Sequence, residues 1–287
     1  YALSLKTFQN MGYFIAHQHI PQAIVDHLCQ QLGTSSHLPK LPSTTLYRYH
    51  KTIRHYFHSK PWSETGKDSA RSIAHQAAYE AAQTLNMPAD ILNVAIEALR
   101  QQSFELPPFD VLCRLVQHAR KQVNKGMYQK VFQRLNHDHK MAFQALLIVP
   151  EGQLHSAYQK LKDAPKSPRI HHAKELIQHH AWLVTLGNMA PFLKDIPPSK
   201  CLQWAQEAKS LDVSNLMDVS EERRTTLIAC FIDHVQKQTK DYLAEVFCKT
   251  MATVHKRARA ELTALREKNA EQTQTIAYFA YDLLSHF

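Results

Sequence analysis

Two segments of the chain carry positive side chains mixed with amides, hydroxyls and imidazoles, and no acidic residue interrupts either segment. The first lies between Asp26 and Glu64 and contains five Lys and Arg; the second lies between Asp110 and Asp138 and contains six. Each Lys or Arg that meets a phosphate releases condensed counterions, so clustered cations of this kind predict a polyanionic partner. The amides and hydroxyls among them can also hydrogen-bond base edges, which points to double-stranded DNA.

Helical spacing separates an apolar face from a polar face in both segments. Apolar residues recur at intervals of three and four from Ser43 to His58, and again from Phe109 to Lys125. Arg48, near the start of its helix, is the favoured base-reading residue. The alternative is an ordinary solvated basic surface. The predicted DNA contacts are Thr45, Tyr47, Arg48, His50, Lys51, Arg54, His55, Arg114, Gln117, His118, Lys121 and Lys125.

These two helices belong to a repeated plan of an apolar helix, a proline-containing turn and a basic helix. Pro21 and Pro88 are 67 residues apart, and Arg54 and Arg120 are 66 apart, so the register of the two copies holds within one residue. Such a plan is typical of a helix-turn-helix. We therefore predict tandem helix-turn-helix-like domains at residues 1–65 and 66–150, followed by a helical scaffold or dimerisation region at residues 151–287.

The composition predicts an all-α protein. Six glycines and thirteen prolines interrupt the 287 residues, and Ala, Leu, Gln and Lys dominate the periodic segments. The longest apolar run, Met141 to Val149, is too short to cross a bilayer, so we expect no membrane association. The five cysteines are widely spaced and odd in number, which favours reduced thiols in a cytoplasmic setting.

The region after residue 150 has a less specific pattern. A stretch rich in Lys and Pro, from Lys160 to Pro168, indicates a linker. In the last predicted helix, apolar residues form one stripe from Leu243 to Leu265. This stripe either packs inside its own chain, which is the more common outcome, or pairs with a second copy to form a homodimer. The predicted helices are Arg169 to Gly187, Ser199 to Ser210, Val219 to Lys237 and Asp241 to Lys268.

No motif for catalysis or for cofactor binding is present in the sequence. The chain has no phosphate-cradling glycine loop, no Gly-x-Ser-x-Gly turn and no convincing acidic pair. Nineteen histidines include the pairs at 171–172 and 179–180 and a cluster at 137–139, but no Cys or His spacing typical of a metal site accompanies them. We expect no catalytic residue, no metal ligand and no cofactor in this chain.

Several short motifs resemble the N-terminal region of the replicative transposases of bacterial Tn-three-type transposons. The likeness covers essentially the whole chain, more loosely in its second half. It departs at His58-Ser59-Lys60, where such proteins usually carry Gly-Phe-Arg, and in the turn from Thr34 to Leu41. The matching residues are Met11-Gly12-Tyr13-Phe14, Ile20-Pro21, Val25, His27, Gln31-Leu32-Gly33, Tyr49-His50, Ile53-Arg54, Lys60-Pro61-Trp62, Arg114-Leu115-Val116, Pro191-Phe192, Asp195-Ile196-Pro197 and 254–259.

This resemblance implies binding to the terminal inverted repeats of a transposon through tandem helical DNA-binding domains. It also implies that strand cutting and joining belong to a later ribonuclease-H-like domain with an acidic, Mg²⁺-binding triad, which matches nothing in these residues. Two alternatives stay open: a regulatory DNA-binding protein of the same ancestry, and a helical scaffold whose basic faces meet acidic proteins or RNA.

Overall fold

The computed structural model describes residues 1–35, 41–63, 65–66, 68–163 and 169–285, and within these ranges the chain is all-α, as the composition predicts. One isolated parallel bridge joins Lys60 to Phe104, and the described residues form no strand. Lys40, one of the cations in the first acid-free segment, and residues 164–168 of the predicted linker lie outside the described residues.

Contacts divide the chain into two units. The first comprises residues 1–134 and 194–203, and the second comprises residues 135–193 and 204–287. Residues 194–203 thus group with a part of the chain from which 59 residues separate them. The domain boundaries at residues 65 and 150 stay predictions.

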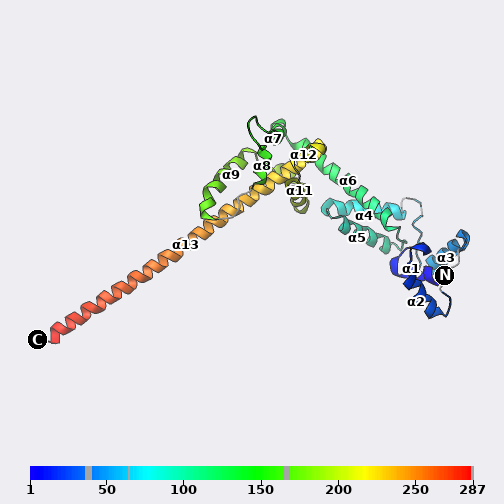
Figure 1. The fold of residues 1–287 in the computed structure, drawn as a ribbon, viewed down its shortest axis with the longest axis horizontal. Helices are drawn as coiled ribbons and strands as arrows, with labels where there is room; N and C mark the ends of the chain where they lie inside the picture. The colour runs from blue at the N-terminus through cyan, green and yellow to red at the C-terminus, as the bar shows by residue number, and fades with distance from the viewer. Residues whose placement is uncertain (36–40, 64, 67, 164–168, 286–287) are drawn as a thin grey trace. The chain divides into compact units, whose positions relative to one another are not determined.

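Six helices of the first unit form two successive groups of three (Figure 1). In the first group α1 contacts both α2 and α3, and in the second α4 contacts both α5 and α6. The sequence predicted the last two helices of each group, but it did not predict α1 or α4. The bounds are α1 Ala2–Met11, α2 Gln22–Leu32, α3 Ser43–Tyr56, α4 Ala70–Thr84, α5 Pro88–Gln101 and α6 Phe109–Arg134, with a short 3₁₀ turn at His17–His19.

A stripe of alanines explains how α4 packs against two helices at once. Four alanines at intervals of four residues are fully buried along α4, and their short side chains let the larger residues of α5 and α6 approach. Ser69 caps the helix by accepting a hydrogen bond from the backbone N–H of Ser72. The alanines are Ala70, Ala74, Ala78 and Ala82.

The second half of α6 packs against residues that come much later in the chain. The helix continues past Lys125, the last of the predicted DNA contacts, and reaches Arg134. Arg134 forms an ion pair with Asp195, and the buried ammonium group of Lys200 donates a hydrogen bond to the side chain of Asn124 at 2.8 Å. These contacts hold residues 194–203, with the start of α11 (Pro198–Ser210), in the first unit.

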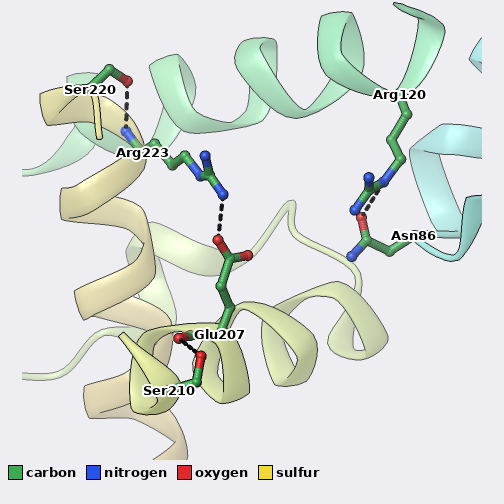
Figure 2. Close-up of polar contacts among 6 residues, drawn as sticks. All are labelled: Asn86, Arg120, Glu207, Ser210, Ser220 and Arg223. Atoms are coloured by element: carbon green, nitrogen blue, oxygen red, sulfur yellow. Dashed lines mark hydrogen bonds and ion pairs between the residues drawn. The ribbon is translucent and has the colours of Figure 1, made fainter. Parts of the chain in front are cut away.

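The second unit is built around the first turns of one long helix, α13 (Glu221–Ser285). Residues 225–233 of this helix are all buried, and α9 contacts α13 most extensively. Arg223, in the first turn of α13, forms an ion pair with Glu207 (Figure 2). The other helices of the unit are α7 His137–Leu147, α8 Ala157–Lys162, α9 Ala173–Thr185, α10 Ala190–Leu193 and α12 Val213–Asp218.

One prediction about the C-terminal region was wrong, and one of two alternatives for its apolar stripe holds only in part. The helices predicted at 219–237 and 241–268 form one continuous helix, because no Gly or Pro interrupts the connection and the hydroxyl of Thr239 donates to the carbonyl of Val235, one turn earlier. Of the two alternatives for the apolar stripe, packing inside its own chain extends only to Val246. Phe247 is 65% exposed, and every residue from 251 to 285 is exposed.

Candidate nucleic-acid interface

The outward face of α3 carries four of the predicted DNA-binding residues. Tyr47, Arg48, Lys51 and His55 are exposed, at the spacing of one side of a helix, and Thr45 at the start is half-buried. Ile53, on the opposite side, is fully buried and fixes the rotation of the helix about its axis. Arg48 and Lys51 form no ion pair with the described residues, so both charges face solvent.

His50 and Arg54, also predicted as DNA contacts, turn toward the protein. The imidazole of His50 stacks on the ring of Phe14, with ring centroids 3.8 Å apart. Burial lowers the pKa of His50, and the neighbouring charge of Arg54 lowers it further, so the ring is neutral near pH 7 and adds no positive charge. The guanidinium of Arg54 lies 5.6 Å from the Phe14 ring centroid and forms an ion pair with Glu105 at 2.9 Å.

Glu105 ties the two three-helix groups together. One carboxylate oxygen accepts from Arg54, and the other accepts from the backbone N–H of Trp62 at 3.1 Å. At the isolated bridge between Lys60 and Phe104, the backbone N–H of Lys60 donates to the carbonyl of Ser103 at 2.7 Å, and the carbonyl of Lys60 accepts from the backbone N–H of Glu105 at 2.9 Å. Sequence reasoning missed this role, because Glu105 lies 51 residues from Arg54.

Gly12 forms a second contact between the groups. Its carbonyl accepts from the backbone N–H of Leu106 at 2.8 Å, and its φ of 74° is in the left-handed region that favours glycine. A Cβ at this position would lie 3.2 Å from the Leu106 side chain. Gly12, Phe14, Arg54 and Trp62, all part of the motifs that resemble transposases, therefore hold the first unit together.

We expect Glu105→Ala to destabilise the first unit by about 2 kcal/mol, because it removes two hydrogen bonds and leaves the mostly buried guanidinium of Arg54 without its acceptor. Denaturant unfolding of the purified protein measures this change. Glu97→Ala, on the exposed surface of α5, is the matched control and should change stability by less than about 0.5 kcal/mol. Equal stability of the two variants would contradict the role assigned to Glu105.

All five predicted residues of α6 are exposed. Arg114, Gln117, His118, Lys121 and Lys125 follow one side of the helix, opposite a buried row that includes Val116 and Ala119. The guanidinium of Arg114 forms an ion pair at 2.6 Å with Asp110, one turn earlier, and both side chains are well exposed. A surface pair of this kind contributes little stability, so a phosphate can replace Asp110 as the partner of Arg114.

A groove of about 680 Å³ lies where the first turns of α4 approach α6. It brings Arg114 and His118, two predicted contacts, together with Arg71 and His75, which the sequence analysis did not single out. The rings of His75 and His118 are 5.8 Å apart. In the sequence, Ser69 could have indicated that a helix begins just before Arg71 and His75, because Ser is a preferred helix N-cap residue. None of the α3 residues lines this groove.

Arg120, another cation of the second acid-free segment, faces inward, and it lies near the buried Lys200. The guanidinium of Arg120 donates to the side chain of Asn86 at 3.3 Å (Figure 2). Lys200 is fully buried, and burial, followed by the nearby charge of Arg120, lowers its pKa from 10.5 to about 8. Arg120, the repeat equivalent of Arg54, therefore also has a structural contact.

Two further features bear on the range of functions. Across the described ranges, no three His, Cys, Asp or Glu side chains converge as metal ligands. None of the helices found there combines the length and apolar character needed to span a bilayer.

The fold and these side chains define an all-α protein with cationic faces on α3 and α6. Residues 1–119 match a family described as a domain of unknown function, DUF4158. Over 279 residues the chain is 18% identical to the transposase for transposon Tn1546 of Enterococcus faecium. This alignment covers 95% of the chain and 28% of that transposase, so the chain spans less than a third of its relative's length. The similarity relates nearly the whole chain to part of a transposase.

Proposed function

We propose that the chain binds double-stranded DNA through the outward faces of α3 and α6, and that its target is the terminal inverted repeat of a transposon. The observation that carries this proposal is the exposure of Arg48 and Lys51 on one helix and of Lys121 and Lys125 on the other. None of the four forms an ion pair with a described residue, so their charges are available to phosphates.

The arrangement of the helices supports this assignment. In each group of three, the cationic helix is the last, as in three-helix variants of the helix-turn-helix, whose third helix enters the major groove. Arg48 and Gln117 can hydrogen-bond base edges, whereas Lys51, Lys121 and Lys125 are suited to phosphates. Arg54 and Arg120 instead stabilise the protein, and His50 contributes no charge at neutral pH.

The transposon end, as the target, follows from the similarity to a transposase, whose printed name assigns it to a transposon. In this proposal the chain supplies end recognition and no chemistry. Cutting and joining of strands, with the Mg²⁺ that they require, belong to a separate ribonuclease-H-like domain. We also place the protein in the bacterial cytoplasm, where transposon DNA is found.

Fluorescence anisotropy with a labelled transposon-end duplex tests this function. We expect binding to the end sequence roughly 100-fold or more tighter than to a scrambled duplex of the same composition. Incubation of the same complex with Mg²⁺ or Mn²⁺ should produce neither nicks nor joined strands. Equal affinity for both duplexes would remove end recognition from the proposal, and cleavage that survives repeated purification would contradict the absence of chemistry.

A further inference from the structure

The second half of α13 is an exposed amphipathic helix. Figure 1 shows α13 continuing, orange to red, beyond α9, the helix that contacts it most extensively. Leu262 is 48% exposed, Leu265 is 59% exposed and Ile276 is 69% exposed. A helix without packing partners is marginally stable in water, because most helical stability in proteins comes from burial of an apolar face. The second half of α13 is therefore expected to be stabilised by a partner that buries its exposed apolar stripe.

The stripe repeats every 11 residues rather than every seven. Leu243, Val254, Leu265 and Ile276 are spaced by 11, and two parallel series have the same period. At 11 residues per three turns the stripe runs almost straight along the helix, so a straight partner of equal length can follow it over roughly 60 Å. The other two series are Phe247, Ala258, Asn269 and Ala280, and Met251, Leu262, Thr273 and Leu284.

The amide of Asn269 indicates which kind of helix binds the stripe. It occupies an interior position of the stripe, four residues after Leu265, which corresponds to position a of a coiled coil. An amide at such a position is unfavourable against an apolar surface but can hydrogen-bond to a second amide. A single Asn at position a is a known determinant of register and of the two-stranded state. The residue that best satisfies the amide is Asn269 of an identical helix, aligned in parallel.

The charges that flank the stripe favour the same alignment. Glu261 directly precedes Leu262 on one flank, and Arg266 directly follows Leu265 on the other. In a parallel pair the opposite flanks of two helices face each other, so Glu261 lies opposite the partner's Arg266, and the symmetry repeats the ion pair. In an antiparallel pair like flanks face each other, so Glu261 would lie away from the partner's Arg266.

We propose that residues 247–280 of α13, which the chain itself leaves exposed, bind the same segment of a second copy of this chain, in parallel and in register, as a two-stranded coiled coil. The apolar stripes of the two helices are buried against each other, Asn269 pairs with the partner's Asn269, and Glu261 pairs with the partner's Arg266. This pairing does not depend on DNA binding by α3 and α6. It gives one assembly two copies of the DNA-binding unit.

Disulfide trapping of the full chain tests the register. The exposed thiol of Cys248 is first replaced by Ser to provide the background. In that background Asn269→Cys and Ala258→Cys, each alone, should give a covalent dimer as the main product of mild oxidation, because each position faces itself across a parallel pair. Lys256→Cys, on the side of α13 away from the stripe, is the matched control and should stay largely uncrosslinked.

An antiparallel dimer with full overlap would crosslink only when the Ala258→Cys and Asn269→Cys chains are mixed, and that result would overturn the proposal. Light scattering of the unmodified chain at tens of micromolar should give twice its mass of 33.0 kDa. A monomer would also overturn the proposal. Leu262→Glu with Leu265→Glu should dissociate the dimer but retain binding of one duplex end, which keeps this test separate from that of the proposed function.

Discussion

Replacing Arg48, Lys51, Lys121 and Lys125 together by Ala should lower the affinity for a transposon-end duplex by about 10³-fold or more. Each phosphate contact contributes close to one unit to the logarithmic salt slope, so its loss costs about tenfold in affinity near 0.1 M salt. The four side chains are exposed, two on α3 and two on α6, and their substitution should leave the buried core intact. Anisotropy titrations at several salt concentrations measure both the affinity and the slope.

Single substitutions should separate the two kinds of contact. Lys51→Ala and Lys121→Ala should weaken binding to end and scrambled duplexes almost equally, and each should reduce the salt slope by about one unit. Arg48→Ala should instead remove about 1–3 kcal/mol preferentially from the end duplex, if its guanidinium reaches a guanine edge. Arg114→Ala has the same expectation, reduced because Asp110 already compensates its charge in the free protein.

The matched control removes the same net charge from the second unit. Lys174, Lys240, Lys256 and Lys268 are exposed there, and their replacement by Ala should change affinity far less than the quadruple variant of α3 and α6. Equal losses in the two quadruple variants would mean that only bulk charge matters. Unchanged affinity in the first variant would show that α3 and α6 are solvated surfaces, and DNA binding would have to be reassigned.

Lys200 should make the stability of the first unit increase with pH. Its folded pKa of about 8 lies below the ordinary value of 10.5, so between these values the unfolded chain binds more protons than the folded chain. Stability therefore rises as pH increases through this window, and falls as the buried amine becomes charged near pH 8. We expect a gain of about 2 kcal/mol between pH 7 and 9.5, measured by denaturant unfolding at each pH.

Lys200→Met should remove this increase, because no proton then binds at the buried position. The variant loses the hydrogen bond to Asn124, but it also avoids burial of a charge, so its stability at pH 7 should equal or exceed that of the unmodified protein. Burial raises the pKa of Tyr158, which lowers stability only above pH 10, outside this window. An identical pH profile for Lys200→Met would contradict the assignment.

Local sequence patterns were sufficient for the fold class and for the polar faces of two helices. The spacing of apolar residues predicted α2, α3, α5 and α6, because a helix that buries one face must repeat its pattern every three to four residues. The same spacing placed Arg48, Lys51, Lys121 and Lys125 opposite the buried residues, and the structure exposes all four. Charges at these positions need no distant partner, so their exposure follows from the local sequence.

Only the tertiary structure decided which cations face inward. Arg54 has the same periodicity as its exposed neighbours, and its inward position depends on Glu105 and Phe14, which lie far away in the chain. Arg120 and Lys200 are likewise fixed by Asn86 and Asn124. The alanine stripe of α4 gave a weak signal, because short side chains are compatible with either burial or exposure.

The stripe of α13 shows the same division between sequence and structure. The sequence determined that one side of this helix is apolar from Leu243 onward, whereas the structure decided that the chain itself covers only the part up to Val246. The helical spacing of apolar residues predicts that one face of α13 is buried, but it does not identify the surface that buries this face. The covering surface depends on where distant elements lie, and that information is present only in the folded structure.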